Sequence, residues 1–169
     1  RLLSTLLGPA GERMETDAEL AERTCQWLDA RAKDPFFVWL QLYDPHIPYA
    51  PPRDLLRGEQ APARMDESFE QADQVREGVL QLAPEQRAWV RSLYDAEVRA
   101  SDAAVGRVLD QLRALGLYDD ALIVFTSDHG EEFFEHGLIE HGHALYDEVL
   151  RVPLLVKLPR QSERVDVRH

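Results

Sequence analysis

The chain has 169 residues, of which 44% are hydrophobic and 30% charged, a composition that suits one domain with an ordinary core. Its formal net charge of −12 argues against nonspecific nucleic-acid binding, because neutralising phosphates requires clustered Lys and Arg. A single cysteine excludes an internal disulfide and a multi-cysteine zinc site, and no apolar run approaches the roughly 20 residues that cross a bilayer.

Both ends of the sequence look interrupted. The chain starts at Arg1, and residues 164–169 begin what resembles another strand and then stop. We therefore expect residues 1–169 to be part of a single domain of a longer protein.

The first predicted helix starts with Asp17 as its N-cap and runs to about Lys33. Apolar residues recur on one face of it at helical spacing, and Cys25 belongs to that face. Because no neighbour offers a base or a positive charge, Cys25 is interpreted as a structural residue rather than a nucleophile.

A strongly apolar run at Phe36–Tyr43 predicts a central strand, since Asp34 and Pro35 break the preceding helix. Polar chemistry follows directly in the segment Asp44-Pro45-His46. A histidine in a loop is often without function, but the position at a strand end makes His46 a candidate for binding.

Residues 44–82 are rich in proline and acidic side chains, and they predict a long surface excursion with one short helix near Ser68–Leu80. A long helix then begins near Pro84 and ends at Gly116, with an apolar stripe at helical spacing. Its carboxylates are interpreted mainly as solvated or capping groups, with a supporting role at a site as the alternative; they include Asp95, Glu97 and Asp102.

The run Ala121–Phe125 predicts another buried strand, which ends abruptly on Thr126 and Ser127. Asp128, His129 and Gly130 follow, where open α/β sheets bind ligands beyond the carboxyl ends of their strands. Strand, long helix and strand in this order predict a right-handed crossover between parallel strands. Because parallel strands bring their carboxyl ends together, we expect His46 to lie at the same sheet edge as Asp128.

The next loop contains His136, His141 and His143, which together with Asp128 and His129 could supply a transition-metal site, although free loop spacing is a weak signal. A helical turn is expected at 145–150 and a third strand at 152–158, with Pro153 at its start.

Three blocks in this order resemble the sulfatase family of the alkaline-phosphatase-like superfamily. They are PFFVWLQLYDPHIPYAPP, YDAEVRASDAAVGRVLDQLRALGLYDDALIVFTSDHGEEFFEHG and HALYDEVLRVPLLVKLP. The resemblance implies an α/β fold with a mainly parallel sheet flanked by helices, incomplete at both ends of this chain.

Members of that family hydrolyse sulfate esters with a formylglycine nucleophile beside a calcium ion, and formylglycine is made from Cys or Ser in a C/S-x-P-x-R motif. The 169 residues contain no such motif, and Cys25 is followed by Gln-Trp-Leu. The resemblance therefore implies that the nucleophile lies outside this chain and that the chain alone is inactive.

The resemblance carries four residues over. Asp128 and His129 match metal ligands, and His46 matches a histidine that contacts the sulfate in many relatives. His141 falls where many relatives have a lysine, so a neutral imidazole there would hold sulfate less strongly. The implied cofactor is a divalent metal, Ca²⁺ first with Zn²⁺ or Mn²⁺ as alternatives, and the implied partner is a sulfated small molecule or glycan.

Two other readings stay open. One is a metal-dependent phosphodiesterase or phosphotransferase of the same superfamily, which would use Asp128, His129 and a downstream histidine. The other is a noncatalytic fragment. The sequence does not identify the sulfate ester, the compartment or the oligomeric state.

Overall fold

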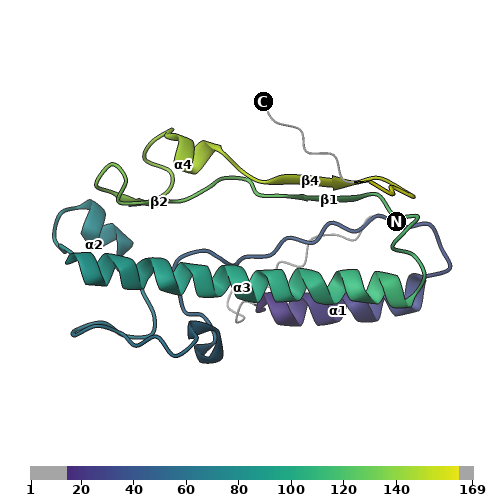
Figure 1. Ribbon diagram of the computed structural model, residues 1–169, viewed down its shortest axis with the longest axis horizontal. Coiled ribbons are helices and arrows are strands. Elements are labelled where there is room, and N and C mark those ends of the chain that lie inside the picture. Colours follow the sequence, from purple (N-terminus) through teal and green to yellow (C-terminus); the bar gives the residue numbers. More distant parts are fainter. Residues whose placement is uncertain (1–14, 164–169) are drawn as a thin grey trace.

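The computed structural model describes residues 15–163. Helices α1 (Asp17–Arg31) and α3 (Pro84–Ala114) pack side by side as one layer (Figure 1). The N-cap of α1 is Thr16 rather than the predicted Asp17: Thr16 Oγ1 accepts from the Glu19 amide at 3.3 Å, and Glu19 Oε2 accepts from the Thr16 amide at 2.8 Å. This reciprocal capping box leaves the Asp17 carboxylate for other contacts.

Helix α3 confirms the long predicted helix. Pro84 lies in its first turn, and Gly116 follows its end with a φ of 70°, a conformation that suits glycine. The apolar stripe is buried as expected, at Trp89, Val90, Leu93, Ala96, Ala104 and Leu112. Within residues 15–163, no helix combines the length and apolar character of a membrane span.

A ribbon of short strands forms the second layer (Figure 1). Strand β1 (Ile123–Thr126) pairs antiparallel with β4 (Leu154–Lys157), with Val124 opposite Val156. Between them lie the antiparallel hairpin of β2 (Glu132–Phe133) and β3 (Ile139–Glu140) and the single turn of α4 (Asp147–Leu150). The two predicted strands and the helical turn of this region are therefore confirmed, but the predicted burial of the first strand is wrong for the described residues, because Val124 is 56% and Phe125 43% exposed.

The predicted parallel sheet is wrong for the residues that the structure describes. Phe36–Tyr43 is extended but pairs with no strand there, and both described sheets are antiparallel. The apolar run predicted that these side chains are buried, but a local pattern does not specify which strand, if any, pairs with the segment. Strand β4 returns antiparallel because the connection from β1 holds a hairpin and one helical turn instead of a long crossover helix.

The excursion at 44–82 is less solvated than predicted. It contains the short helices η1 (Arg53–Leu56) and α2 (Ala72–Arg76), and a bridge joins Tyr49 to Phe69. Several of its side chains enter the main core beside α3, among them Tyr49, Leu56, Phe69, Ala72 and Leu82.

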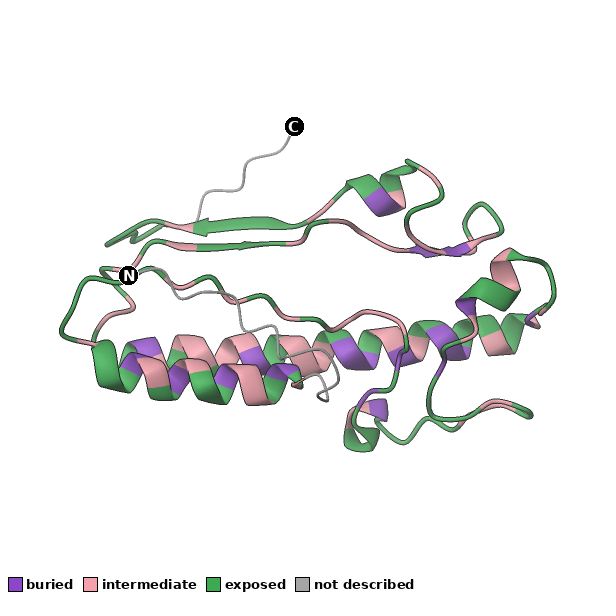
Figure 2. Cartoon of the chain, turned by 180° about the vertical axis from the view of Figure 1, so that it is seen from behind, coloured by how far each residue is buried: buried purple, intermediate pink, exposed green. Residues whose placement is uncertain are grey.

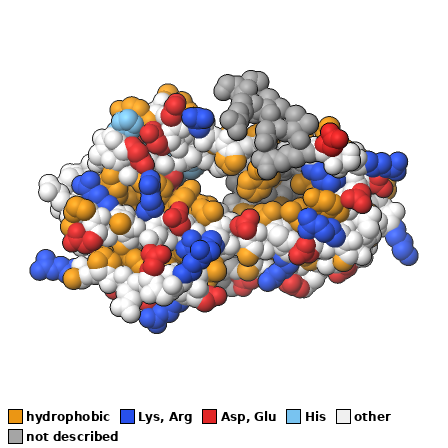
Figure 3. Space-filling view, viewed as in Figure 1, with side chains coloured by type: hydrophobic (Ala, Val, Ile, Leu, Met, Phe, Trp, Pro, Cys, Tyr) orange, Lys and Arg blue, Asp and Glu red, His pale blue; other side chains and the backbone are white. Residues whose placement is uncertain are grey.

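The strand ribbon has much exposed apolar surface (Figure 2). Leu154 is 68% exposed and Val124 56%, and the extended segment below the ribbon adds Trp39 at 68%. Hydrophobic side chains are visible along the seam between the helix layer and the ribbon (Figure 3). The core is therefore concentrated at the end of α3 that packs against the excursion and the β2–β3 hairpin.

Candidate functional site

Three histidines from separate segments gather at one place. His46 follows the extended segment, His129 follows β1, and His141 follows β3. The His141 ring lies 3.8 Å from the His129 ring, nearly parallel to it, and 5.4 Å from the His46 ring, between centroids. The structure thus brings His46 to the Asp128-His129 segment, as predicted.

The ring nitrogens of these histidines have defined partners. His46 Nδ1 donates to the Ile47 carbonyl oxygen at 2.7 Å, and His129 Nδ1 donates to the Gly130 carbonyl oxygen at 2.8 Å. A carbonyl can only accept, so Nδ1 carries the proton in both rings. In a neutral ring Nε2 therefore carries a lone pair and can accept a hydrogen bond or bind a cation. Nε2 donates a hydrogen bond only when both ring nitrogens are protonated.

Glu131 fixes the third ring. Its Oε1 lies 3.0 Å from His141 Nδ1, and its Oε2 accepts from the Tyr49 hydroxyl at 2.7 Å. The side chain of Glu131 is 5% exposed and that of His141 21%, so the contact is largely shielded from water. Burial first, and then the nearby Glu131 carboxylate, raises the pKa of Tyr49 above its usual range, so its hydroxyl stays a donor.

Asp128 and His129 have the geometry of two ligands for one cation. His129 Nε2 lies 3.8 Å from Asp128 Oδ1, and the Asp128 side chain is 78% exposed. Each atom would lie about 2.0–2.5 Å from a shared divalent ion, so their separation fits. Residues 15–163 hold no group of three or more potential ligands, which makes this pair a partial set.

The other two histidines belong to separate contacts, so the hypothesis of a five-residue transition-metal cluster is wrong for the described residues. The His136 ring stacks on Tyr146 with centroids 3.6 Å apart, and His136 Nε2 lies 3.5 Å from Glu148. His143 Nε2 lies 3.2 Å from Glu132 Oε2. Each imidazole lies beside a carboxylate of another segment, Glu148 on α4 for His136 and Glu132 on β2 for His143.

Glu132 organises the turn between β2 and β3. Its Oε1 accepts from the amides of His136 and Leu138 at 3.0 and 3.2 Å, and the side chain is fully buried. Burial alone would raise the pKa of Glu132, but the His143 contact and the two amides outweigh it and hold the pKa below its ordinary value. The carboxylate therefore acts as a structural acceptor.

Sequence reasoning missed Glu131 and Tyr49 as members of the site. It also interpreted Glu97 as mainly solvated, whereas Glu97 is 3% exposed and accepts from the Ala50 amide. Helical spacing carried a signal for Glu97, because it lies four residues after Leu93 and seven before Ala104, both of which are buried. No comparable spacing marks Glu131.

Cys25 is structural, as predicted. The thiol is buried against α3, where Sγ lies 3.8 Å from the Arg107 carbonyl oxygen. Burial, followed by the nearby carboxylate of Glu22, raises the pKa of Cys25, which disfavours the reactive thiolate.

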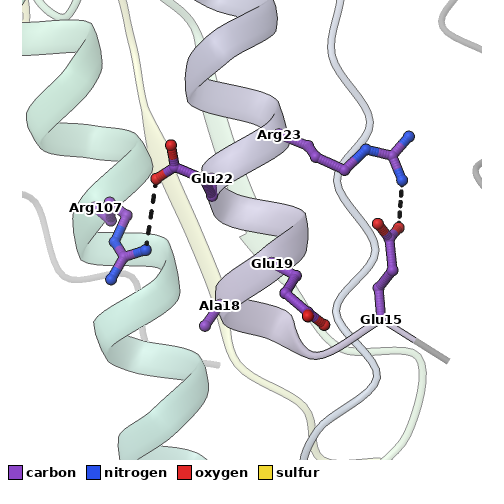
Figure 4. Close-up of a pocket in the computed structure, with 6 residues that line it drawn as sticks. All are labelled: Glu15, Ala18, Glu19, Glu22, Arg23 and Arg107. Atoms are coloured by element: carbon purple, nitrogen blue, oxygen red, sulfur yellow. Dashed lines mark hydrogen bonds and ion pairs between the residues drawn. The ribbon is translucent and has the colours of Figure 1, made fainter. Parts of the chain in front are cut away.

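A hollow of about 460 Å³ lies between α1 and α3 (Figure 4). Its lining consists of Glu15, Ala18, Glu19, Glu22, Arg23 and Arg107. Arg23 pairs with Glu15, and Arg107 lies 3.8 Å from Glu22. None of the candidate site residues lines the hollow, so the histidine group is the better candidate.

The Sulfatase family model matches residues 8–169. The chain belongs to the sulfatase family. Multifunctional alkaline phosphatase superfamily protein PehA of Trinickia caryophylli is 32% identical over 161 residues, covering 80% of this chain and 31% of that protein. Ulvan-active sulfatase of Formosa agariphila is 29% identical over 146 residues, covering 83% and 26%.

A solved structure has a similar fold. The phosphonate monoester hydrolase SpPMH from Silicibacter pomeroyi superposes with a TM-score of 0.64 at 25% identity, covering 86% of this chain and 33% of that one. This chain thus spans about a third or less of the length of these relatives.

Proposed function

We propose that the intact protein is a sulfuric ester hydrolase and that residues 1–169 form part of its single catalytic domain. Family membership supports the class of hydrolase. The observation that carries the proposal is the gathering of His129, His141 and His46, whose neighbouring ring centroids lie 3.8 and 5.4 Å apart, beside the exposed Asp128 carboxylate.

In this proposal Asp128 and His129 hold a divalent cation, Ca²⁺ first and Zn²⁺ or Mn²⁺ as alternatives. The cation would supply positive charge against the ester oxygens, which an acidic protein otherwise repels. His46 and His141 contact the sulfate in this proposal, and Glu131 orients His141 through Nδ1. The nucleophile, a formylglycine, would come from outside these 169 residues, so the chain alone is expected to be inactive.

The proposed substrate class is a sulfated small molecule or glycan. The relative from Formosa agariphila is named for activity on ulvan, which supports a saccharide ester for the intact protein. The described residues include the candidate anion contacts, whereas the groups that would select a particular sugar are not assigned.

The test compares the full-length protein with His46→Ala and His141→Ala, using 4-nitrophenyl sulfate. His46 donates to the sulfate from Nε2 when its ring carries both protons, and removing this donor in His46→Ala is expected to lower kcat/KM by about 10²-fold. His136→Ala is the matched control, because its ring lies against Tyr146 and Glu148 instead of the histidine group. An equal loss in His46→Ala and His136→Ala would contradict the site.

A second candidate is a metal-dependent phosphodiesterase or phosphotransferase. It is favoured by the nitrogen donor at His129, which suits Zn²⁺ or Mn²⁺ better than Ca²⁺, and by the likeness to PehA and SpPMH. The ratio of activities on 4-nitrophenyl sulfate and on the matching phosphate diester and phosphonate monoester decides between the two. Absence of all these activities would favour a noncatalytic protein.

A further inference from the structure

The loop that carries His46 is held at both ends by buried carboxyl groups. At the start, Asp17 Oδ1 accepts from the Tyr43 amide at 2.9 Å and from the Asp44 amide at 3.5 Å. At the end, Glu97 Oε1 accepts from the Ala50 amide at 2.6 Å. Asp17 is 2% exposed and Glu97 3%, so water does not compete for these bonds.

Ser101 ties the Asp17 anchor to α3. It lies one helical turn after Glu97, and its Oγ is 2.6 Å from Asp17 Oδ2 and 2.9 Å from the Asp44 carbonyl oxygen. Helix α3 therefore contacts both ends of the loop, through Ser101 and Asp17 at the start and through Glu97 at the end. His46 lies between these two ends, with its ring centroid 4.6 Å from that of Tyr43 and 5.4 Å from that of His141.

Three carboxyl groups, Asp17, Asp44 and Glu97, share this region without a cation. Among the ion pairs of residues 15–163, none involves these three groups. The same residues hold no cluster suited to a metal ion. Glu97 Oε2 is buried without a hydrogen-bond partner, so an ionised Glu97 would leave a charged oxygen unsolvated.

A proton is the remaining way to neutralise Glu97. The pKa of Glu97 is raised to about 8, chiefly by burial; the Ala50 amide lowers it, and the nearby Asp44 and Asp17 carboxyl groups add to the rise. Burial, and then Asp17, also raises the pKa of Asp44. The other titratable groups that face Glu97 are the hydroxyls of Tyr49 and Tyr94, which carry no charge at neutral pH.

We propose that Glu97 is a positioning residue for His46: it holds the backbone at Ala50 while Asp17 holds Tyr43, and the two together fix the loop between them. The proposed role in substrate binding rests on the sulfate ester hydrolase function, whereas the anchoring of the loop does not. Glu97 acts through His46 and touches no reacting atom.

The first measurement is amide hydrogen exchange of the peptide 43–50 in the full-length protein. Glu97→Ala removes the acceptor, so exchange of the Ala50 amide should speed up on the order of tenfold. Glu97→Gln keeps a carbonyl acceptor in a side chain that has no acidic proton, so the Ala50 amide should exchange as slowly as in wild type. Asp95→Asn is the control, because Asp95 is an exposed carboxylate on the same helix. Unchanged exchange in Glu97→Ala, or a Glu97→Gln variant as fast as Glu97→Ala, overturns the proposal.

The second measurement is thermal stability against pH, and it serves even if Glu97→Ala does not fold. A carboxyl whose pKa is raised on folding costs stability progressively as pH rises from its ordinary value of 4.5 to the native value of about 8. The Tm difference between Glu97→Gln and wild type should therefore increase in favour of the variant from pH 4.5 to about 8 and stay constant at higher pH. A constant difference in Tm overturns the protonated anchor.

The third measurement links the anchor to the site. With 4-nitrophenyl sulfate, Glu97→Ala should raise KM by a larger factor than it lowers kcat, and Glu97→Gln should restore both at neutral pH. If wild type hydrolyses no ester, the proposed function fails while hydrogen exchange still decides the anchor. If wild type is active and exchange rises in Glu97→Ala without any change in KM or kcat, positioning of His46 is overturned.

Discussion

Gly130 lies where the backbone after Asp128 and His129 comes close to the backbone of α4. Its amide donates to the Val149 carbonyl oxygen at 2.7 Å, and a Cβ added to Gly130 would lie 2.0 Å from the Glu148 carbonyl oxygen. The opposing atom belongs to the backbone and cannot turn aside. A side chain at position 130 would therefore push α4 away from the Asp128-His129 segment.

We expect Gly130→Ala to destabilise the protein by about 1–3 kcal/mol, the range for a forced steric overlap. Gly106→Ala is the matched control, because a Cβ added to Gly106 inside α3 meets no atom within 4 Å and should gain about 0.5–1 kcal/mol in helix propensity. Urea unfolding of both variants measures the difference. Equal stability of the two variants would contradict the close approach.

At the same scale, sequence reasoning found the histidines but not their supports. His46 and His129 stand directly after apolar runs, a position that pointed to a shared edge, and the ring contacts bear out their proximity. The argument for it, parallel strands ending together, was wrong for the described residues. Glu131 and Asp17 were missed because no regular spacing links them to their partners. His141 lies 10 residues from Glu131, and Tyr43 lies 26 residues from Asp17.

Helix α3 is the element on which the described core depends. Leu93 is fully buried in its stripe, packed with Trp89, Val90, Ala96 and residues of the excursion. Burial of this stripe explains why the helix persists over 31 residues although most of its carboxylates and arginines, Glu97 and Arg99 excepted, are exposed to water.

Leu93→Ala is expected to lower the free energy of unfolding by about 2–5 kcal/mol, because it removes buried methyl groups and leaves a cavity. Val98→Ala, on the same helix but 41% exposed, should change it by about 0.5 kcal/mol or less. Chemical denaturation followed by circular dichroism gives both values. Similar losses in the two variants would show that the stripe does not form the core.

A helix could be predicted from the sequence where apolar residues recurred at helical spacing over many residues and a glycine or proline marked its end. The stripe from Trp89 to Leu112 and the glycine after it marked α3 closely, whereas the apolar run 36–43 was interpreted as a strand that the described residues do not contain. Strand pairing depends on a partner far away in the chain, and no local pattern specifies that partner. The same limit applies to the antiparallel pairing of β1 with β4.

At the scale of the whole molecule, the ribbon and the candidate metal pair share one property. Apolar side chains of β1 and β4 are exposed on the described chain, and Asp128 is exposed beside them at the end of β1. The sulfatase relatives are about three times as long as the aligned chain or longer. Both features fit our proposal that this chain is one part of a larger catalytic domain.

Metal binding tests that proposal. A hard cation such as Ca²⁺ takes about six to eight oxygen ligands, and residues 15–163 offer the partial pair of Asp128 and His129 without a third ligand grouped with them. The 169-residue chain should therefore bind Ca²⁺, Zn²⁺ or Mn²⁺ weakly, and the full-length protein should bind one of them much more tightly.

Isothermal titration of both forms, each with Asp128→Ala, measures this difference. Asp128→Ala should abolish tight binding and activity together in the full-length protein, since it removes the carboxylate ligand and leaves one nitrogen. Asp120→Ala is the control, because Asp120 is an exposed aspartate that pairs with Arg160 instead. If full-length Asp128→Ala kept both its metal and its turnover, Asp128 would not be a ligand, and the hydrolase mechanism would have to place its cation elsewhere.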